Sequence, residues 1–225
     1  MKLSVIIPVY NEGSNIKTCL ESIKRLQPLE IIVADGGSSD DTCILAEEAG
    51  AKIVRSTKGR GIQLNAGALR AKGDILWFLH ADACLPEELK LEHLKSTIEN
   101  GYAGGFFRLR FNDNSISIRV VEFFANLRSR LFHLPYGDQA IFVKRDIFEG
   151  IGGFRKYPFL EDLDFILRLK KVYRLKYIPA SITVSARRLK KGYFLSPIFV
   201  SLRNVFIAAL FMLGVKPDKL IFLYK

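Results

Sequence analysis

Hydrophobic residues follow two alternating periods over the first 80 positions of the chain. Short runs rich in Ile and Val, such as 3–9 and 29–35, are typical of strands buried on both faces. Apolar residues at helical spacing separate these runs. The predicted strands are 3–9, 29–35, 51–56 and 74–80, and the predicted helices are 14–26, 39–49 and 62–71. This strand-helix alternation predicts an α/β fold with a mostly parallel, Rossmann-like central sheet flanked by helices.

The remaining sequence continues the same domain and ends in a basic segment. Helices are predicted at 115–134 and 159–171, and strands at 140–143 and 181–185. A chain of 225 residues, 49% of them hydrophobic, suits one large domain. We therefore predict a single domain over 1–192, with a nucleotide-binding half at 1–100 and an acceptor half at 101–192. A basic amphipathic helix is predicted over 193–225.

The positive charge is concentrated near the C-terminus. Residues 165–225 carry 13 basic side chains and one acid, whereas residues 1–164 carry 21 basic and 22 acidic side chains. Such a segment favours nucleic acid, an anionic membrane surface or phosphorylated ligands. Its basic residues alternate with many aliphatic and aromatic ones, which is unusual for RNA-binding segments. The membrane surface is therefore favoured and nucleic acid is not expected.

The C-terminal apolar run is too short to span a bilayer. It covers residues 205–215 without interruption, eleven residues, whereas spanning requires about 20. Two interpretations stay open: an interfacial helix on the inner face of the membrane, or a helix packed on the domain or on a second subunit, as in a homodimer. Three scattered cysteines, with no signal-like N-terminus, favour reduced thiols and a cytoplasmic protein.

Polar side chains follow the predicted strands at the edge where ligands bind parallel sheets. These candidate residues are Pro8, Tyr10, Glu12, Asp35, Gly37, Lys58, Arg60, His80 and Asp82. Each of these groups alone could be an ordinary turn, helix cap or solvated loop. Their expected meeting at one edge of the sheet is what indicates a ligand site. Asp35 could accept from a base or ribose, or belong to a turn. Lys58 and Arg60 could attract an anion at a helix N-terminus, or be solvated.

Asp82 and His80 are candidate metal ligands. Mg²⁺ needs only one or two protein carboxylates when substrate phosphates supply the other ligands. An imidazole suits a borderline cation such as Mn²⁺, or donates to a phosphate or ribose oxygen. The alternative places Asp82 at a helix N-terminus and His80 at a hydrogen-bonded strand end.

The second half adds further candidates. Three acids, Glu161, Asp162 and Asp164, lie in the first turn of a predicted helix, where they favour the helix dipole, but one of them could also serve as a general base. Adjacent guanidiniums suit a diphosphate, although an exposed basic turn explains them too. The predicted diphosphate or acceptor contacts are Asp138, Gln139, Arg187 and Arg188.

Taken together, these motifs resemble family 2 glycosyltransferases of GT-A fold. The matching pieces are "SVIIPVYNEGSNI", "IIVADGGSSDDT", "GRGIQLNAGALRAKGDILWFLHAD", "GGF" and "LEDLDFILRL". A closer resemblance, carried by "FLHAD", "LPYGDQAIFVKR" and "SARR", is to a compact bacterial subgroup labelled transferase 2 associated with radical-SAM/selenodomain proteins.

The resemblance implies inverting transfer of a sugar, hexosyltransferase-like, from a nucleotide-diphosphate donor, most often a UDP-sugar, to an acceptor hydroxyl, with Mg²⁺ or Mn²⁺ as cofactor. Asp82 would hold the metal as the second acid of the family's D-x-D, while His80 replaces the first acid and favours Mn²⁺. Asp162 would be the base, supported by Glu161.

Arg188 stands at the Arg of Q-x-x-R-W, but the altered flanking residues argue against polymer synthesis. Pro8, Tyr10, Glu12 and Asp35 would surround the nucleoside, and the predicted nucleotide contacts extend to Gly37, Lys58, Arg60, Asn65 and Ala81.

Two other functions fit parts of the sequence. A sugar-nucleotide nucleotidyltransferase has a similar sheet, but it normally needs a Gly-rich loop after the first strand, where "PVYNEGSN" has one glycine. A catalytically silent nucleotide-sugar sensor or membrane adaptor would be consistent with the altered D-x-D.

Overall fold

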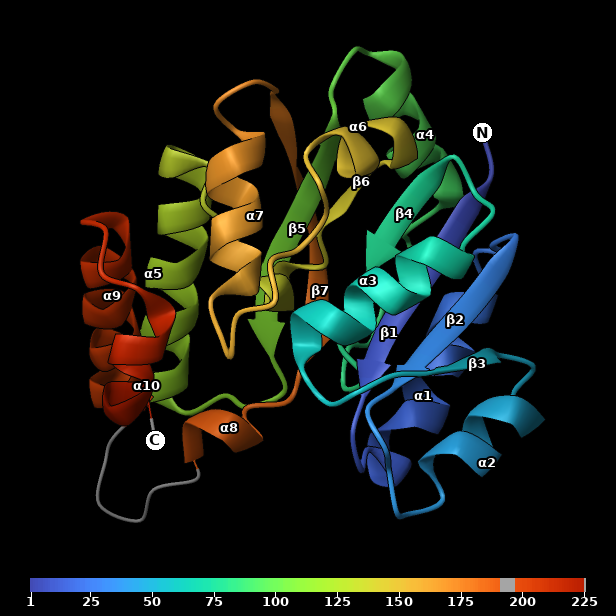
Figure 1. Cartoon of the computed structure of the whole chain (residues 1–225), viewed down its shortest axis with the longest axis horizontal. Coiled ribbons are helices and arrows are strands. Elements are labelled where there is room, and N and C mark those ends of the chain that lie inside the picture. Colours follow the sequence, from blue (N-terminus) through green and yellow to red (C-terminus); the bar gives the residue numbers. More distant parts are fainter. Residues whose placement is uncertain (191–196, 225) are drawn as a thin grey trace.

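A seven-stranded sheet forms the centre of the protein (Figure 1). The computed structural model describes residues 1–190 and 197–224, apart from the side chain of Arg188. The strands are β1 (Leu3–Val9), β2 (Glu30–Asp35), β3 (Lys52–Arg55), β4 (Ile75–Phe78), β5 (Gly104–Phe111), β6 (Phe142–Lys144) and β7 (Leu175–Val184). Their order is β3-β2-β1-β4-β6-β5-β7, and β6 runs antiparallel to both of its neighbours while the other described strands share one direction.

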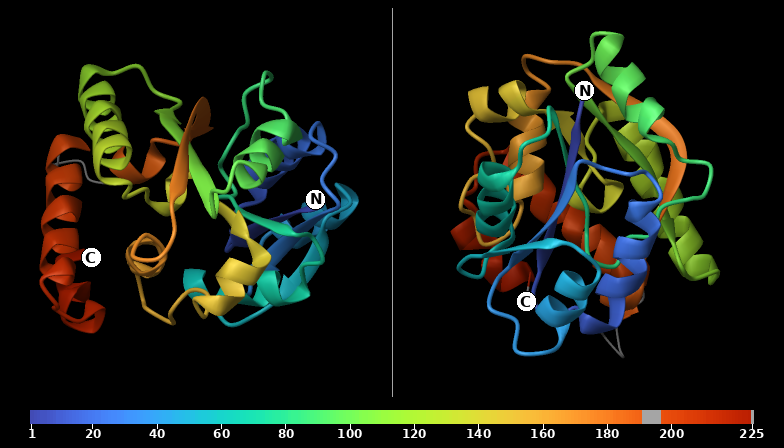
Figure 2. Two further views of the ribbon diagram at one scale, coloured as in Figure 1. Left: turned by 90° about the horizontal axis from the view of Figure 1, so that it is seen from above. Right: turned by 90° about the vertical axis from the view of Figure 1, so that its right-hand side faces the viewer.

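Helices cover both faces of this sheet (Figure 2). One core cluster joins the sheet to α1 (Gly13–Lys24), α2 (Thr42–Glu48), α4 (Leu91–Glu99) and α5 (Ile116–Phe132). A second cluster joins the opposite face to α3 (Arg60–Arg70), α6 (Arg145–Gly150) and α7 (Glu161–Leu169). Side chains alternate along β1, so this strand contributes to the core on both faces of the sheet. Val5 and Ile7 belong to the first cluster and Ile6 to the second. The predicted fold class, a mostly parallel α/β sheet flanked by helices, is confirmed.

The strand β5 was not predicted from the sequence. It begins with two glycines, which are poor strand formers. The structure explains these glycines, because the backbones of β5 and β6 approach each other closely here. A Cβ atom on Gly104 would collide with the carbonyl oxygen of Phe142 on β6. The predicted strand at 181–185 is in fact the last part of the longer β7.

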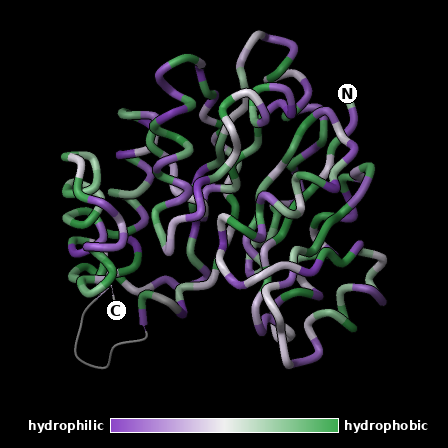
Figure 3. Tube along the Cα trace, in the orientation of Figure 1, coloured by the Kyte–Doolittle hydropathy of each residue, from purple (hydrophilic) through white to green (hydrophobic). Residues whose placement is uncertain are grey.

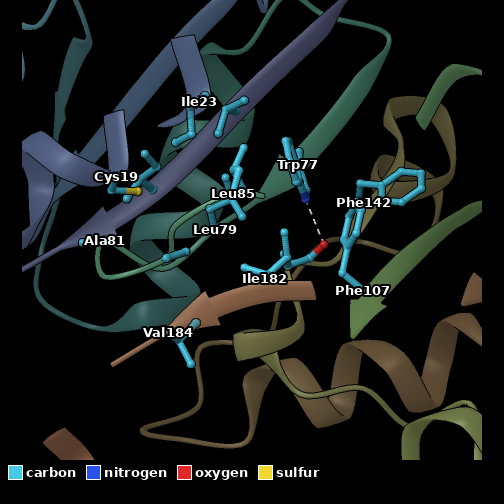
Figure 4. Packing of buried hydrophobic residues seen from close by; sticks show 14 of the residues in the cluster. Cys19, Ile23, Trp77, Leu79, Ala81, Leu85, Phe107, Phe142, Ile182 and Val184 are labelled. Carbon is cyan, nitrogen blue, oxygen red and sulfur yellow. Dashed lines mark hydrogen bonds between the residues drawn. The ribbon is translucent and has the colours of Figure 1, made fainter. Parts of the chain in front are cut away.

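Trp77 on β4 connects the two halves of the chain (Figure 4). Its side chain is fully buried and its ring lies 5.4 Å from that of Phe107, centroid to centroid. Its Nε1–H donates to the carbonyl oxygen of Ala140, 2.9 Å away. This oxygen lies just after the short helix η1 (Gly137–Gln139), so Trp77 positions a segment that enters the functional site described below.

The helix α5 turns polar as well as apolar side chains toward the sheet, since Ile118 and Val121 are buried in the core beside Glu122. Glu122 accepts from the backbone N–H of Phe111 at 3.0 Å, and the Asn126 amide bonds to both backbone groups of Leu109. Its apolar Phe123 and Phe124 point outward instead and are 61% and 59% exposed. The short strand β6 pairs only with Gly104 and Gly105 of β5, so the later backbone of β5 needs other partners on that side, and Glu122 and Asn126 supply them.

The C-terminal segment folds as two helices rather than the single predicted one. These are α9 (Pro197–Met212) and α10 (Pro217–Tyr224), separated by a turn in which Gly214 has a φ of +96°. They lie beside α5 at one end of the molecule, where Figure 3 shows the largely hydrophobic course of α9. Ile207 and Leu220 pack with Phe159, which precedes α7.

This packing matches one of the two interpretations, in which the segment packs on the domain. No helix in the described part of the chain is long and apolar enough to cross a membrane. The predicted boundary between residues 192 and 193 lies outside the described residues. The short α8 (Arg187–Lys190) is the last element before it.

Replacing Trp77 with Phe should destabilise the fold. The change removes one buried hydrogen bond and leaves a cavity, so we expect the free energy of unfolding to fall by about 1.5–3 kcal/mol. Urea denaturation followed by circular dichroism measures this loss without relying on the single tryptophan. Val172→Ala is the control, because Val172 is 71% exposed and its truncation should change stability by no more than about 0.5 kcal/mol. Equal losses in the two variants would contradict this role for Trp77.

Candidate active site

A cleft of about 440 Å³ opens at the carboxyl ends of the parallel strands. Its acidic residues come from the loop after β4, from η1 and from the start of α7, namely Asp82, Asp138, Glu161 and Asp162. Side chains of α9 and α10 form part of its wall. The cleft thus unites residues from both halves of the chain and from the C-terminal helices.

Arg60 joins the two acids at the start of α7 to the first half of the chain. Its Nε donates to Glu161, and its Nη2 donates to Asp162 Oδ2 at 2.9 Å. Its Nη1 also lies 3.3 Å from His80 Nε2. We predicted that Arg60 would bind the nucleotide, but its guanidinium is committed to these side chains. The two carboxylates raise the pKa of Arg60 further, against the opposing effect of burial.

Glu161 and Asp162 differ in their access to the cleft. The side chain of Glu161 is 2% exposed and that of Asp162 is 10% exposed. Burial raises the pKa of Glu161, although Arg60 opposes the shift. Asp162 Oδ2 also accepts from the backbone N–H of Gly137 at 2.7 Å. Asp162 Oδ1 accepts from the backbone N–H of Leu163 at 2.8 Å, so three donors hold this carboxylate in place. Asp162 is the acid better placed to meet a substrate.

The predicted metal ligands, His80 and Asp82, follow the end of β4, and Arg187 lies near Asp82. Arg187 Nε lies 3.8 Å from Asp82 Oδ2, and its Nη2 donates to both carboxylate oxygens of Glu12. The pKa of Arg187 is raised, first by its hydrogen bond to Glu12. A residue predicted to hold the diphosphate is thus paired with residues predicted to hold the metal and the nucleotide.

These side chains fit a cation that shares its ligands with a diphosphate. Within residues 1–190 and 197–224, no three His, Cys, Asp or Glu side chains are grouped to hold a metal ion. One carboxylate, from Asp82, and one imidazole, from His80, are a small donor set. Such a set suits Mg²⁺ or Mn²⁺ bound together with phosphate oxygens, rather than in an all-protein cage.

Asp35 stabilises its own turn. Its carboxylate accepts from the backbone N–H of Gly37 at 3.1 Å and from that of Ser38 at 3.0 Å, with Gly37 at a φ of +92°. Burial opposes ionisation of Asp35, but these hydrogen bonds outweigh it and lower its pKa. The turn thus explains Asp35 better than the sequence suggested, and its contact with a nucleoside stays a prediction.

Tyr10 and Lys58 meet at the rim of the sheet edge. Lys58 Nζ lies 3.5 Å from the centroid of the Tyr10 ring, which is 43% exposed. The adjacent Pro8 lies with Arg60 and His80 along a small second cavity. An exposed aromatic ring with a nearby ammonium group can stack on a base and attract phosphate.

Three residues predicted to contact ligand also have structural roles. Gln139 is fully buried, and its amide donates to Phe107 O and Ser129 Oγ. The Asn65 amide is occupied at both ends by the backbone of Phe154. The methyl group of Ala81 is buried in the core (Figure 4). Internal partners occupy the amide of Asn65 and the N–H groups of Gln139, whereas Gln139 Oε1 is buried without a hydrogen-bond partner in the described residues. Ligand contacts of these three residues stay predictions.

Asp138 lines the cleft and carries an unusual carboxyl group. Its Oδ1 atom is buried and has no hydrogen-bond partner in the described residues. Burial raises the pKa of Asp138 to about 6, with the charge of Arg128 opposing the shift. The side chain of Arg188, predicted beside Arg187 as a diphosphate ligand, lies outside what the structure describes.

Several cleft residues were not predicted as site residues. Tyr136 precedes Gly137 and stacks on Arg128, with its ring centroid 3.5 Å from the guanidinium carbon. Arg203 and Tyr224 enter the cleft from α9 and α10. Tyr136 lies in the "LPYGDQAIFVKR" motif and could have been suspected. The other two required knowledge of how the C-terminal helices pack.

The fold and the cleft place this protein among α/β proteins that have an acidic ligand-binding cleft at the carboxyl ends of the parallel strands. Comparison with known proteins identifies the family. Residues 4–160 match the model of glycosyl transferase family 2. The chain belongs to glycosyl transferase family 2.

Among curated relatives, the probable glycosyltransferase YdaM of Bacillus subtilis is 26% identical over 212 residues, covering 81% of this chain and 50% of that protein. The PGL/p-HBAD biosynthesis glycosyltransferase of Mycobacterium bovis is 31% identical over 175 residues, covering 73% of this chain and 68% of that protein. The chain spans about half the length of the first curated relatives it matches.

Solved structures share the fold at low sequence identity. Glucosyl-3-phosphoglycerate synthase from Mycobacterium tuberculosis, in complex with Mn²⁺, uridine diphosphate and glucosyl-3-phosphoglycerate, has a TM-score of 0.69 and 21% identity. The match covers 95% of this chain and 80% of that one. S. aureus TarS has a TM-score of 0.66 and 17% identity, covering 97% of this chain and 46% of that one. The sheet predicted as GT-A is therefore shared with glycosyltransferase structures.

Asp138→Asn should stabilise the protein at neutral pH. The folded chain retains the Asp138 proton up to about pH 6, whereas the unfolded chain loses it near pH 3.8, so stability falls as the pH rises between these values. The amide avoids this penalty. We expect a gain of roughly 1–2 kcal/mol at pH 7.5 and none at pH 4, measured by urea denaturation.

The matched control is Asp146→Asn, at a carboxylate that is 68% exposed and outside the cleft. Its removal should change stability by less than about 0.5 kcal/mol at pH 7.5. An Asp138→Asn effect that is the same at both pH values would contradict the raised pKa.

Proposed function

We propose that this chain catalyses inverting transfer of a sugar from a nucleotide-diphosphate donor, a UDP-sugar, to an acceptor hydroxyl. The carrying observation is that the acids Asp162 and Asp82, from opposite halves of the chain, line one cleft at the carboxyl edge of the sheet. Family membership supports glycosyl transfer, and the uridine diphosphate and Mn²⁺ in the mycobacterial synthase structure support this donor class and a divalent cation.

Asp162 is the general base in this proposal. It takes the proton of the acceptor hydroxyl while the acceptor oxygen attacks the anomeric carbon and the bond to the diphosphate oxygen breaks. A single displacement of this kind inverts the anomeric centre. Arg60 and the Gly137 N–H orient Asp162, and its oxygens retain lone pairs for a hydroxyl. Glu161 is more buried and supports the site by holding Arg60.

The donor occupies the strand ends of the first half. Tyr10 and Asp35 contact the nucleoside, and Lys58 and Arg187 contact the diphosphate. Arg187 must exchange its Glu12 partner for phosphate oxygens when the donor binds. Asp82 and His80 are the residues that would hold Mg²⁺ or Mn²⁺, which when bound neutralises the leaving diphosphate.

The finer predictions from sequence are part of the same proposal. They are a hexose as the transferred sugar, action at the cytoplasmic side, the division into donor and acceptor halves, and membership of the radical-SAM/selenodomain-associated subgroup. The "FLHAD" motif with His80 in place of the first D-x-D acid supports the last of these.

Asp162→Asn should abolish transfer without abolishing donor binding. An amide cannot take the proton, so we expect kcat to fall by about 10²–10⁴-fold. Turnover of a panel of UDP-sugars with Mn²⁺ measures kcat, and calorimetry with UDP and Mn²⁺ measures donor binding, which should change by less than about 3-fold.

Asp82→Asn should instead weaken Mn²⁺-dependent UDP binding by about 10-fold or more.

Asp146→Asn serves again as the exposed-acid control and should leave both readouts unchanged. Retained turnover in Asp162→Asn would show that Asp162 is not the base. Binding of UDP-sugars by the wild-type chain, with no turnover of any of them, would favour the silent sensor or adaptor over a transferase.

We propose further that α5 and α9 bind an anionic membrane surface. Exposed apolar side chains lie on both helices, including Phe124 at 59% and Phe206 at 57% exposed. The helices pack side by side; α9 belongs to residues 165–225, which carry 13 basic residues and one acid, and α5 contributes the exposed Arg130. Apolar side chains beside basic ones suit an interface of acyl chains and anionic headgroups.

A double variant of Phe124→Ser and Phe206→Ser should lose membrane binding. We expect the wild type to float with phosphatidylglycerol vesicles several-fold more than with phosphatidylcholine vesicles, and the variant to lose about 5-fold or more of this binding. Ile44→Ser with Val172→Ser is the control, since these residues are 58% and 71% exposed on other parts of the surface.

Light scattering on the same proteins tests the homodimer. If the Phe124 and Phe206 variant converts a dimer to a monomer while flotation stays unchanged, the face binds a second copy and the membrane proposal is wrong.

A further inference from the structure

One basic residue in the cleft, Arg203, has no acidic partner among the residues that the structure describes. Arg203 is the only charged residue of α9 in the sequence, within the run "PIFVSLRNVFIAALFM". Sequence analysis placed the basic residues of this segment near membrane headgroups. The structure instead places Arg203 in the wall of the cleft that also contains Asp82 and Asp162.

The contacts of Arg203 leave its charge uncompensated. Its Nη2 lies 3.5 Å from the side-chain oxygen of Asn204, and its guanidinium lies 5.8 Å from the centroid of the Tyr224 ring. Its Nε is buried without a hydrogen-bond partner, and Arg203 forms no ion pair with any side chain that the structure describes. By contrast, Arg60 and Arg187 are paired with carboxylates. A partly buried cation of this kind gains most from an anion that enters the cleft.

Apolar side chains lie next to Arg203 on its own helix. Val200 and Ile207 are three residues before and four after it on α9, and the cleft lining also includes Phe111, Phe159, Val184 and Leu189. The Phe159 and Tyr224 rings stack there at 4.7 Å between centroids. A nucleotide diphosphate would be poorly matched to such a wall. An apolar group with one negative charge would match both the wall and the cation.

We propose that Arg203 binds the anionic group, a carboxylate or phosphate, of an amphiphilic acceptor whose apolar body lies against α9 and α10. This inference rests on the proposed function, because the reacting hydroxyl of the same molecule would lie at Asp162. The acceptor is thereby assigned a chemical class: a hydroxylated apolar molecule with one anionic group apart from the hydroxyl that reacts. Arg203 determines specificity and takes no part in bond making or breaking.

Binding of simple amphiphiles tests this assignment directly. The probes are octyl phosphate, octanoate, octanol and inorganic phosphate, titrated calorimetrically into the full chain with and without saturating UDP and Mn²⁺. We expect Arg203→Gln to weaken binding of at least one of the two anionic amphiphiles by about 10-fold or more and to leave octanol unchanged. The stronger of octyl phosphate and octanoate identifies the anionic group.

Two further variants separate a specific contact from general charge. Arg203→Lys keeps the charge and should restore part of the binding, whereas Lys219→Gln removes an exposed charge of α10 outside the cleft and should have no effect. All variants must unfold at the wild-type urea midpoint and bind UDP and Mn²⁺ as the wild type does. This requirement separates loss of the anionic contact from loss of the fold.

Equal affinity of wild type and Arg203→Gln for both octyl phosphate and octanoate would overturn the proposal. Inorganic phosphate binding as tightly as octyl phosphate would overturn the apolar part of it. A chain that fails to bind UDP, but shows Arg203-dependent binding of an anionic amphiphile, would refute the proposed donor and leave this site standing.

Discussion

The active-site half of this protein depends on one guanidinium held between two carboxylates. Glu161 and Asp162 are adjacent at the start of α7, and two neighbouring buried acids would repel each other and resist ionisation without a cation. Arg60, about 100 residues earlier on α3, supplies that cation and also reaches His80. The same contact therefore joins the two halves of the chain, holds Asp162 in place and connects it through His80 to the loop that carries Asp82.

Charge pairing continues along the floor of the cleft. Arg187 binds Glu12 and lies near Asp82, so cations and carboxylates of the protein already balance one another where the donor is proposed to bind. A donor with its own negative charge and a divalent ion must therefore exchange partners with these side chains. Arg203 lacks such a partner among the described residues, which distinguishes the acceptor side of the cleft from the donor side.

The C-terminal helices link this cleft to the outer surface. The inner side of α9 contributes Ile207 to a small core and Arg203 to the cleft, while Phe206 on the same helix is exposed. The neighbouring α5 holds the backbone of β5 with Glu122 and exposes Phe123 and Phe124 to solvent. An amphiphilic acceptor bound at the cleft wall would thus be separated by one helix from the surface that we propose to contact the membrane.

Local patterns in the sequence determined the parallel first half of the sheet and the residues at its strand ends, because burial on both faces leaves a readable apolar run and strand ends meet at one edge. They did not reveal β5, whose glycines are required by the approach of β6, nor the inward polar residues of α5. They also could not assign partners to Arg60, Asn65, Gln139 and Arg203, whose side-chain types fit several roles. Tertiary structure alone decided those roles, since each depends on which distant acid, backbone group or helix the fold brings within hydrogen-bond distance, or leaves out of reach.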